Sequence, residues 1–315
     1  MHIDPISWHW PRWLAPGFLH LLAGPTGLGK SLLALRIAAC YLDGRPWPDG
    51  TPFGAETGAV LWCESEGAQA LNVDRARRWG LPLRALRSPF ADPLRDANLL
   101  LRDDRQAIGD AAADPAVRIV ILDSLSGARA GADENDSRSL LSTQWLARLA
   151  RDLAKPVLVT HHLRKRGMLD GDGAVHLDRI RGHSSLLQPA RLIWTLDAPH
   201  GVLRLAVAKS NLSVYPGPLR MIIDDTAYPR FEPMGEEPAS EAERAAAWLQ
   251  RELVGGARPA SEMEEAALAQ GISNRTLVRA RAMAGVEAYR GSGAWWWRLR
   301  QAPTAGQQIP EGPCR

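Results

Sequence analysis

One short run, residues 24–31, constrains the fold of this chain more than any other part of the sequence. It reads GPTGLGKS, follows an apolar run at 18–23, and precedes a helical pattern that continues to about Leu42. Glycines at these positions let backbone N–H groups wrap a phosphate, while Lys30 reaches terminal phosphates and Ser31 can bind magnesium. From this composition the pattern arises by chance only about three times in a thousand chains of this length.

The run therefore predicts a site for a nucleoside triphosphate, with ATP and Mg²⁺ as the expected ligands. No spacing motif in the sequence selects the base. The residues expected to cradle the phosphates are Gly24, Pro25, Thr26, Gly27, Leu28, Gly29, Lys30, Ser31 and Leu32.

Continuous apolar runs alternate with helical patterns through the first two thirds of the chain. Further strands are predicted at 59–63, 118–122 and 156–160, and helices at 30–42, from after 67 to about 79, and at 136–153. Runs at 192–196 and 202–208 flank a hairpin turn, and 219–223 adds another strand. This pattern favours an α/β fold with a mostly parallel sheet covered by helices on both faces.

Length and composition suggest a soluble protein with two domains. The chain has 315 residues, 45% of them hydrophobic and 23% charged, and no apolar run of membrane-spanning length, so the cytoplasm is the expected location. The expected parts are an ATPase-like domain at 1–232, a linker at 233–240, a small domain at 241–300 and a disordered tail at 301–315. The net charge is only +3, so any nucleic-acid affinity must come from local basic patches.

Asp123 ends the apolar run at 118–122. In a sheet that carries a phosphate loop, a carboxylate at a strand end lies beside that loop and can hold the magnesium shell together with Ser31. Asp123 and Ser31 are therefore the candidate metal ligands.

Two pairs of polar residues follow other strands. Glu64 and Glu66 come after the strand at 59–63, where a carboxylate can deprotonate an attacking water or simply cap the next helix. His161 and His162 end the run at 156–160. These histidines can contact the γ-phosphate, or they can be loop residues without a functional role. They can also bind a metal, but no carboxylate or cysteine follows at a matching spacing.

Together these residues resemble the RecA-like hexameric ATPases, and more narrowly the plasmid replication helicases of the RepA type, which are related to the DnaB-type helicases. The resemblance covers about residues 10–231. Beyond the phosphate loop it depends on Cys63-Glu64-Ser65-Glu66 with Arg75, Asp133-Glu134-Asn135-Asp136, His161-His162-Leu163-Arg164-Lys165, Arg179-Ile180-Arg181-Gly182-His183-Ser184-Ser185 and Lys209-Ser210-Asn211.

The resemblance implies a role for each matching residue. Glu66 matches the catalytic glutamate, His162 the polar sensor, and Lys209 a cation that reaches the nucleotide of the neighbouring subunit. With Lys30 and Asp123 these complete the candidate catalytic set. Many related helicases carry arginine two residues after the lysine, whereas this chain has Asn211. The arginine finger is therefore open: Arg220, Arg191 or Arg181 can serve, or Lys209 can act alone.

The resemblance also implies two DNA-facing loops, at 126–136 and 164–183. The second loop carries enough positive charge to follow a phosphate backbone, although a solvated basic loop has the same composition. Its candidate DNA contacts are Arg164, Lys165, Arg166, Arg179 and Arg181.

The C-terminal region resembles a winged-helix module. Helices at 261–270 and 274–284 are separated by a short turn, Ser273 or Asn274 is the expected cap, and 286–299 forms a candidate wing. The second helix carries Arg275, Arg279 and Arg281, so Arg275 and Arg279 are candidate DNA contacts. Such modules also bind proteins. Trp295, Trp296 and Trp297 are expected to pack in the wing and core rather than to stack on bases.

These observations favour a ring-forming ATPase that translocates on DNA as helicases do. Two alternatives share the active site: a regulatory DNA-binding ATPase without unwinding activity, and a recombinase-like filament. The expected partners are further copies of the chain, as a hexamer, DNA, and a separate primase or initiator.

Overall fold

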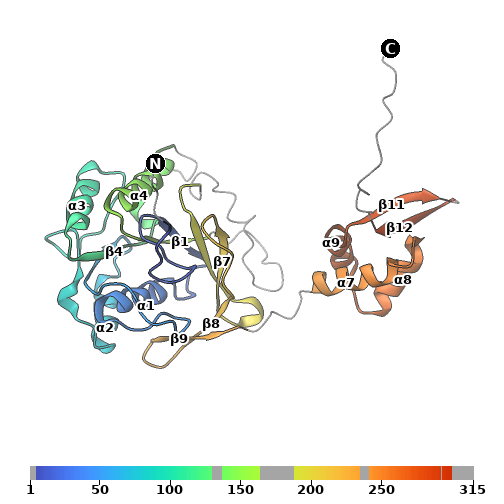
Figure 1. Cartoon of the computed structure of the whole chain (residues 1–315), viewed down its shortest axis with the longest axis horizontal. Coiled ribbons are helices and arrows are strands. Elements are labelled where there is room, and N and C mark those ends of the chain that lie inside the picture. The colour runs from blue at the N-terminus through green and yellow to red at the C-terminus, as the bar shows by residue number, and fades with distance from the viewer. Residues whose placement is uncertain (1–4, 130–136, 164–187, 235–240, 292, 300–315) are drawn as a thin grey trace, which may run out of the picture. The chain divides into compact units, whose positions relative to one another are not determined.

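The computed structural model describes residues 5–129, 137–163, 188–234, 241–291 and 293–299. The chain forms two compact units, residues 1–235 and 236–315. Figure 1 shows both units with their elements labelled.

The first unit is built on a mixed sheet. Within the described residues nine strands are ordered β3-β2-β4-β5-β1-β6-β7-β8-β9. The strands from β3 to β6 in this order pair in parallel, and the pairs β6–β7, β7–β8 and β8–β9 are antiparallel. Their bounds are β1 Leu19–Gly24, β2 Ala59–Glu64, β3 Leu86–Arg87, β4 Val117–Asp123, β5 Val157–His162, β6 Leu192–Asp197, β7 Arg204–Ser210, β8 Leu219–Ile223 and β9 Pro229–Pro233.

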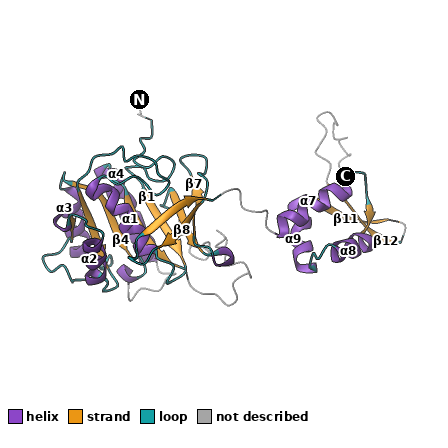
Figure 2. Ribbon diagram, turned by 90° about the horizontal axis from the view of Figure 1, so that it is seen from below, coloured by secondary structure: helices purple, strands orange, loops and turns teal. Residues whose placement is uncertain are grey.

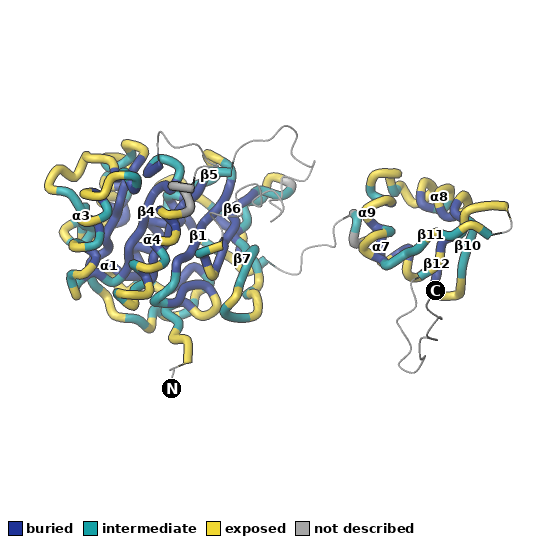
Figure 3. The backbone as a smooth tube through the Cα atoms, turned by 90° about the horizontal axis from the view of Figure 1, so that it is seen from above, coloured by how far each residue is buried: buried dark blue, intermediate teal, exposed yellow. Residues whose placement is uncertain are grey.

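Helices cover both faces of this sheet, which confirms the predicted α/β architecture (Figure 2). Helices α1 (Lys30–Asp43) and α2 (Gln69–Arg78) belong to one hydrophobic core, and α3 (Arg102–Ala113) and α4 (Ser137–Leu153) belong to the other. Strand β1 serves both cores, because Leu22 faces the first while Leu21 and Ala23 face the second. Figure 3 shows the central strands as the most buried part of the unit. Short 3₁₀ turns occur at η1 (Leu83–Ala85), η2 (Gly127–Arg129) and η4 (Pro199–Gly201).

The tryptophans at the N-terminus are core residues. Trp10 stacks on Trp13, with ring centroids 4.7 Å apart, and on Trp47, with ring centroids 5.6 Å apart. The ring of Trp194 packs edge-on against Trp10 and Trp13. All four indoles are at most 1% exposed. Each such pair adds about 0.5–1.5 kcal/mol beyond the burial of its area. Trp10 and Trp13 therefore pack in the core of the first unit.

The second unit combines three helices with a small sheet. Its elements are α7 (Glu241–Leu253), β10 (Arg258–Pro259), α8 (Ala260–Ala269), α9 (Asn274–Ala284), β11 (Val286–Gly291) and β12 (Ala294–Leu299), and the strand order is β10-β12-β11. The Ser273 hydroxyl caps α9 by accepting the Thr276 N–H at 3.2 Å. Leu249, Met263, Leu277 and Trp297 form the centre of its core.

The three consecutive tryptophans differ in environment. Trp297 is 2% exposed and lies under the Arg281 guanidinium, 4.1 Å from the ring centroid. The Trp296 indole N–H donates to the Gly291 carbonyl at 2.9 Å. Trp295 is 57% exposed, so the packing expected of all three is wrong for this one.

Four elements were not expected from the sequence: α3, β3, β9 and β10. Strand β9 includes Pro233, the first residue of the expected linker. In the described part of the chain, no helix is both long enough and apolar enough to cross a bilayer.

Candidate active site

The candidate site lies where the central parallel strands end. The register pairs Gly24 of β1 with His162 of β5, and Glu64 of β2 with Asp123 of β4. The carboxyl ends of these strands therefore share one edge of the sheet. Strand β5 is inserted between β1 and β4, but Asp123 at the end of β4 still reaches the phosphate loop, because its carboxylate accepts a hydrogen bond from Ser31. His162, at the end of β5, lies between Thr26 of the loop and Glu66.

The phosphate loop depends on its glycines for two different reasons. Gly27 and Gly29 have φ values of 86° and 93°, a region that L side chains rarely adopt. Gly24 has no positive φ, and its constraint is packing, because a Cβ there would come closer than 3.0 Å to the Leu196 carbonyl oxygen of β6.

Lys30 begins α1 and folds back into the loop. Its Nζ donates to the Gly24 carbonyl at 3.0 Å and to the Pro25 carbonyl at 2.8 Å, and the residue is only 4% exposed. Burial lowers the Lys30 pKa to about 8, against the opposing charges of Asp123 and Glu66. A poorly solvated cation inside a loop of backbone groups is an arrangement that fits polyphosphate.

Asp123 and Ser31 meet at the base of the loop. The Asp123 carboxylate accepts hydrogen bonds from Ser31 and, at 2.5 Å, from the Thr160 hydroxyl of β5. Burial raises the Asp123 pKa. A hydroxyl and a carboxylate in contact supply the oxygen donors that Mg²⁺ prefers, so these two residues fit the expected metal.

Glu66 is held by a short hydrogen-bonded chain. His162 Nε2 lies 2.9 Å from Glu66 Oε1, and His162 Nδ1 lies 3.4 Å from the Thr26 hydroxyl. The Ser124 hydroxyl donates to the same carboxylate. Because a carboxylate only accepts, Nε2 carries the proton, and in a neutral ring Nδ1 accepts from Thr26. The bond to His162 is the main cause that lowers the Glu66 pKa to about 2.

Glu64 is committed to a separate, buried network. Its carboxylate accepts from the Trp62 indole at 3.1 Å and from the Asn72 amide at 2.9 Å, and also from backbone N–H groups. Burial, together with the charge of Asp123, raises the Glu64 pKa. Of the two glutamates that the sequence left open, Glu66 is therefore the one in contact with the phosphate loop through His162. Likewise His161 is buried and lies 3.2 Å from the Ser126 hydroxyl, away from the loop.

Lys209 lies far from the phosphate loop of its own subunit. On β7 it pairs with Ile193, which pairs with Leu21, three residues before Gly24. Its Nζ donates to the Ala190 carbonyl at 2.9 Å, and burial lowers its pKa. Asn211 N–H donates to the Arg191 carbonyl at 3.0 Å.

Several residues predicted from the sequence lie outside the described residues. They are the motif at 133–136 and the basic residues Arg164, Lys165, Arg166, Arg179 and Arg181. Arg275 and Arg279 are exposed on α9 of the second unit. Three contacts were missed by sequence reasoning: Thr160 and Ser124 in the hydrogen-bond network, and Asn72 on Glu64. None carries a motif.

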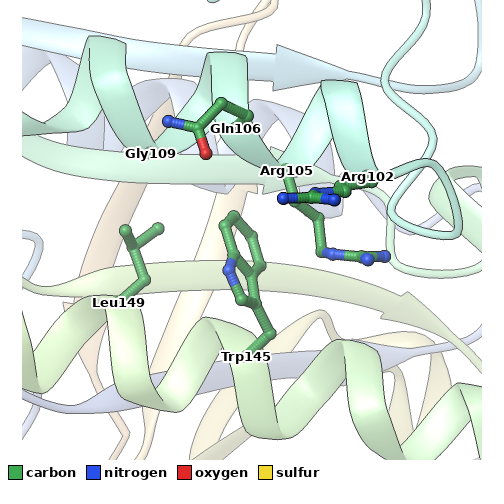
Figure 4. Close-up of a pocket in the computed structure, with 6 residues that line it drawn as sticks. All are labelled: Arg102, Arg105, Gln106, Gly109, Trp145 and Leu149. Atoms are coloured by element: carbon green, nitrogen blue, oxygen red, sulfur yellow. The ribbon is translucent and has the colours of Figure 1, made fainter.

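A separate cavity of about 240 Å³ lies between α3 and α4 (Figure 4). Arg102, Arg105 and Gln106 of α3 face Trp145 and Leu149 of α4. None of these residues belongs to the phosphate loop or the strand ends, so this cavity is distinct from the candidate active site.

Fold and site together define a P-loop ATPase built on a mostly parallel sheet. Residues 2–168 match the family model described as an AAA domain, and the chain belongs to this family. Among solved structures, the chain is similar to the crystal structure of the RadB recombinase, with 20% identity and a TM-score of 0.47 over 70% of this chain and 93% of that one. It is also similar to a second solved structure, that of an ATPase domain, with 18% identity and a TM-score of 0.48 over 69% and 85%. Comparison with curated proteins gives no match.

Proposed function

We propose that this protein hydrolyses ATP at sites shared between the subunits of a ring and uses the hydrolysis to move along DNA. The observation that carries the catalytic part is the chain from Thr26 through His162 to Glu66, which joins the phosphate loop to the candidate base. The part that concerns the ring and DNA rests on the resemblance and on the position of Lys209.

In this proposal each residue at the sheet edge has one task. The loop N–H groups and Lys30 hold the triphosphate, and Ser31 and Asp123 hold Mg²⁺, which supplies charge neutralisation on the phosphates. Glu66 accepts the proton of the attacking water. His162 and Ser124 both engage this carboxylate and keep it weakly basic. Release from His162 makes Glu66 a stronger base, so His162 is its positioning residue.

Lys209 acts from the neighbouring subunit. Through Ile193, Lys209 is in register with Leu21 of β1. Leu21 precedes Gly24 by three residues, which corresponds to about 10 Å along a strand that rises 3.3 Å per residue. A cation at that distance cannot serve its own phosphate loop, whereas a second copy can present it to the next one. Such a cation stabilises charge that develops on the transferred phosphoryl group.

Mixing two inactive variants tests the shared site. Glu66→Gln and Lys209→Ala should each hydrolyse ATP at a small fraction of the wild-type rate. Mixed assemblies should regain activity, because a subunit with intact Glu66 then meets a neighbour with intact Lys209. A mixture no more active than its components would rule out the shared site. Two variants of Glu66, Glu66→Gln and Glu66→Ala, provide the control mixture that must stay inactive.

A strand-displacement assay tests the DNA part, with Lys30→Ala as the control. A regulatory DNA-binding ATPase is the second candidate. Asn211 favours it, because this residue stands where many of the helicases that the chain resembles carry arginine. ATP hydrolysis that is stimulated by DNA without displacement of a strand would support this candidate and exclude the helicase.

A further inference from the structure

The second unit contains a cavity of about 350 Å³, and none of the residues that line it is a candidate active-site residue. It is formed by one side of α7, the turn after α8 and the first turn of α9. Arg244, Trp248 and Arg251 of α7 line it together with Ile272 and Thr276. Trp248 is 9% exposed and provides an apolar floor between the two arginines.

The two arginines that line the cavity are available for an anion. Arg244 and Arg251 are both exposed, and neither forms an ion pair with another described residue. Arg258 of the same unit is different, because it pairs with Glu252 at 2.5 Å and with Glu262 at 3.5 Å. No carboxylate is among the described residues that line the cavity. The described lining of the cavity therefore carries two cations and no carboxylate.

The first turn of α9 adds to this positive character. The helix has 11 residues and no acidic residue in its first turn, so its dipole presents partial positive charge at the Thr276 end. Arg275 is exposed in the same turn.

The spacing of the arginines points to a ligand with repeated negative charge. They are seven residues apart on α7, which corresponds to about 10 Å along a helix that rises 1.5 Å per residue. One DNA strand carries a phosphate about every 3.4 Å along the duplex axis, so this distance spans about three phosphates. A ligand with several anionic groups at this spacing can meet both arginines.

We propose that this cavity seats the phosphodiester backbone of duplex DNA, with Arg244 and Arg251 each neutralising a phosphate beside α9. The inference rests on the DNA binding proposed above, for which Arg275 and Arg279 are the contacts expected from the sequence of this unit. The two sets of residues differ in what they do: the arginines of α7 contact phosphates whatever the sequence, and the arginines of α9 reach base edges.

The test is the salt dependence of duplex DNA binding by the full chain, measured by fluorescence anisotropy without nucleotide. Each neutralised phosphate contributes about 0.9 to the slope of log K against log salt concentration. The double variant Arg244→Ala, Arg251→Ala should therefore lower the slope by about 1.8, equally for unrelated DNA sequences. Replacing both with lysine should restore the slope. Arg148→Ala, which removes an exposed cation of α4, should leave it unchanged.

Three results would overturn the proposal. First, the slope can be unchanged in Arg244→Ala, Arg251→Ala while a second double variant, Arg275→Ala, Arg279→Ala, binds DNA more weakly. This result excludes phosphate binding by the cavity but is consistent with DNA binding by α9. Second, wild-type binding in both double variants removes DNA binding by this unit altogether. Third, Arg244→Ala, Arg251→Ala can bind an acidic peptide more weakly than the wild type does while it binds DNA equally well. The cavity is then a protein-docking site. Circular dichroism and thermal unfolding check that each variant is folded.

Discussion

Replacing Gly127 with alanine should damage catalysis although Gly127 is not among the candidate site residues. It lies in η2, directly beneath the loop that carries Glu66. A Cβ at this position would lie 2.6 Å from Ser65 Oγ and 2.9 Å from Glu66 Cγ, and closer still to the Ser65 carbonyl oxygen. Contacts of a Cβ atom are essentially never shorter than 3.0 Å, so these atoms must move, and full relief to 3.4 Å requires about 0.8 Å at Ser65 Oγ and about 0.5 Å at Glu66 Cγ.

Ser65 cannot absorb this movement alone. Its hydroxyl donates to the Ser124 carbonyl at 2.7 Å and accepts the Ser124 N–H at 2.8 Å. The displacement therefore reaches Glu66 and its bonds to His162 and Ser124. A misplacement of about 1 Å can lower a rate by about 100-fold, and overpacking costs about 1–3 kcal/mol of stability.

The assay separates chemistry from binding. We expect kcat for ATP hydrolysis to fall by about 100-fold in Gly127→Ala, and the Kd for a fluorescent ATP analogue to change little, because residues 24–31 are untouched. Gly109→Ala on α3 is the matched control, since its Cβ meets no atom within 4 Å. It should keep full activity and gain about 0.5–1 kcal/mol. A folded Gly127→Ala protein with wild-type kcat would refute the reasoning.

Three further predictions follow from the same site. Burial lowers the Lys30 pKa from 10.5 to about 8, so the unfolded chain binds this proton more tightly than the folded chain. In urea unfolding without nucleotide, the stability of the wild type relative to Lys30→Met should therefore rise by about 2–3 kcal/mol from pH 7 to 10. The low Glu66 pKa contributes stability that is present above pH 4.5 and lost towards pH 2; His162→Ala should weaken this dependence in acid unfolding and lower kcat. Gly24→Ala should lose about 1–3 kcal/mol in thermal unfolding through the clash with Leu196, even without nucleotide.

Most elements of the fold could be predicted because their sequence patterns are strong. The central strands are continuous apolar runs, and their predicted ends agree with the structure within one or two residues. Helix α3 was missed because its buried side consists of Ile108, Ala112 and the carboxylate of Asp104. Asp104 is stabilised there by the Asn98 N–H at 2.8 Å and by Arg95. A helix with so little apolar surface and with Gly109 in its interior has no clear period.

The short strands were missed for a different reason. Strands β3 and β10 have two residues each, and β9 lies at the edge of the sheet. They are strands because a neighbouring strand offers backbone partners, and this depends on tertiary structure rather than on local pattern.

The two glutamates illustrate the limit for the site. Glu64 and Glu66 follow the same strand, and either spacing is compatible with a catalytic carboxylate. Their difference arises from Trp62 and Asn72, which bind Glu64, and from His162, which binds Glu66. Trp62 and Asn72 belong to no sequence motif, and His162 is 96 positions from Glu66 in the chain. The sequence alone could prefer Glu66 only through the resemblance to a family.

The order of strands explains why His162 acquires its place. Along the chain β5 follows β4, but in the sheet it is inserted between β4 and β1. Its last residue therefore contacts both Thr26 of the phosphate loop and Glu66 beyond β4. If β4 adjoined β1 directly, the loop and Glu66 would have no shared neighbour at this edge. We infer that a triphosphate in the loop can be sensed at Glu66 through these two hydrogen bonds of His162.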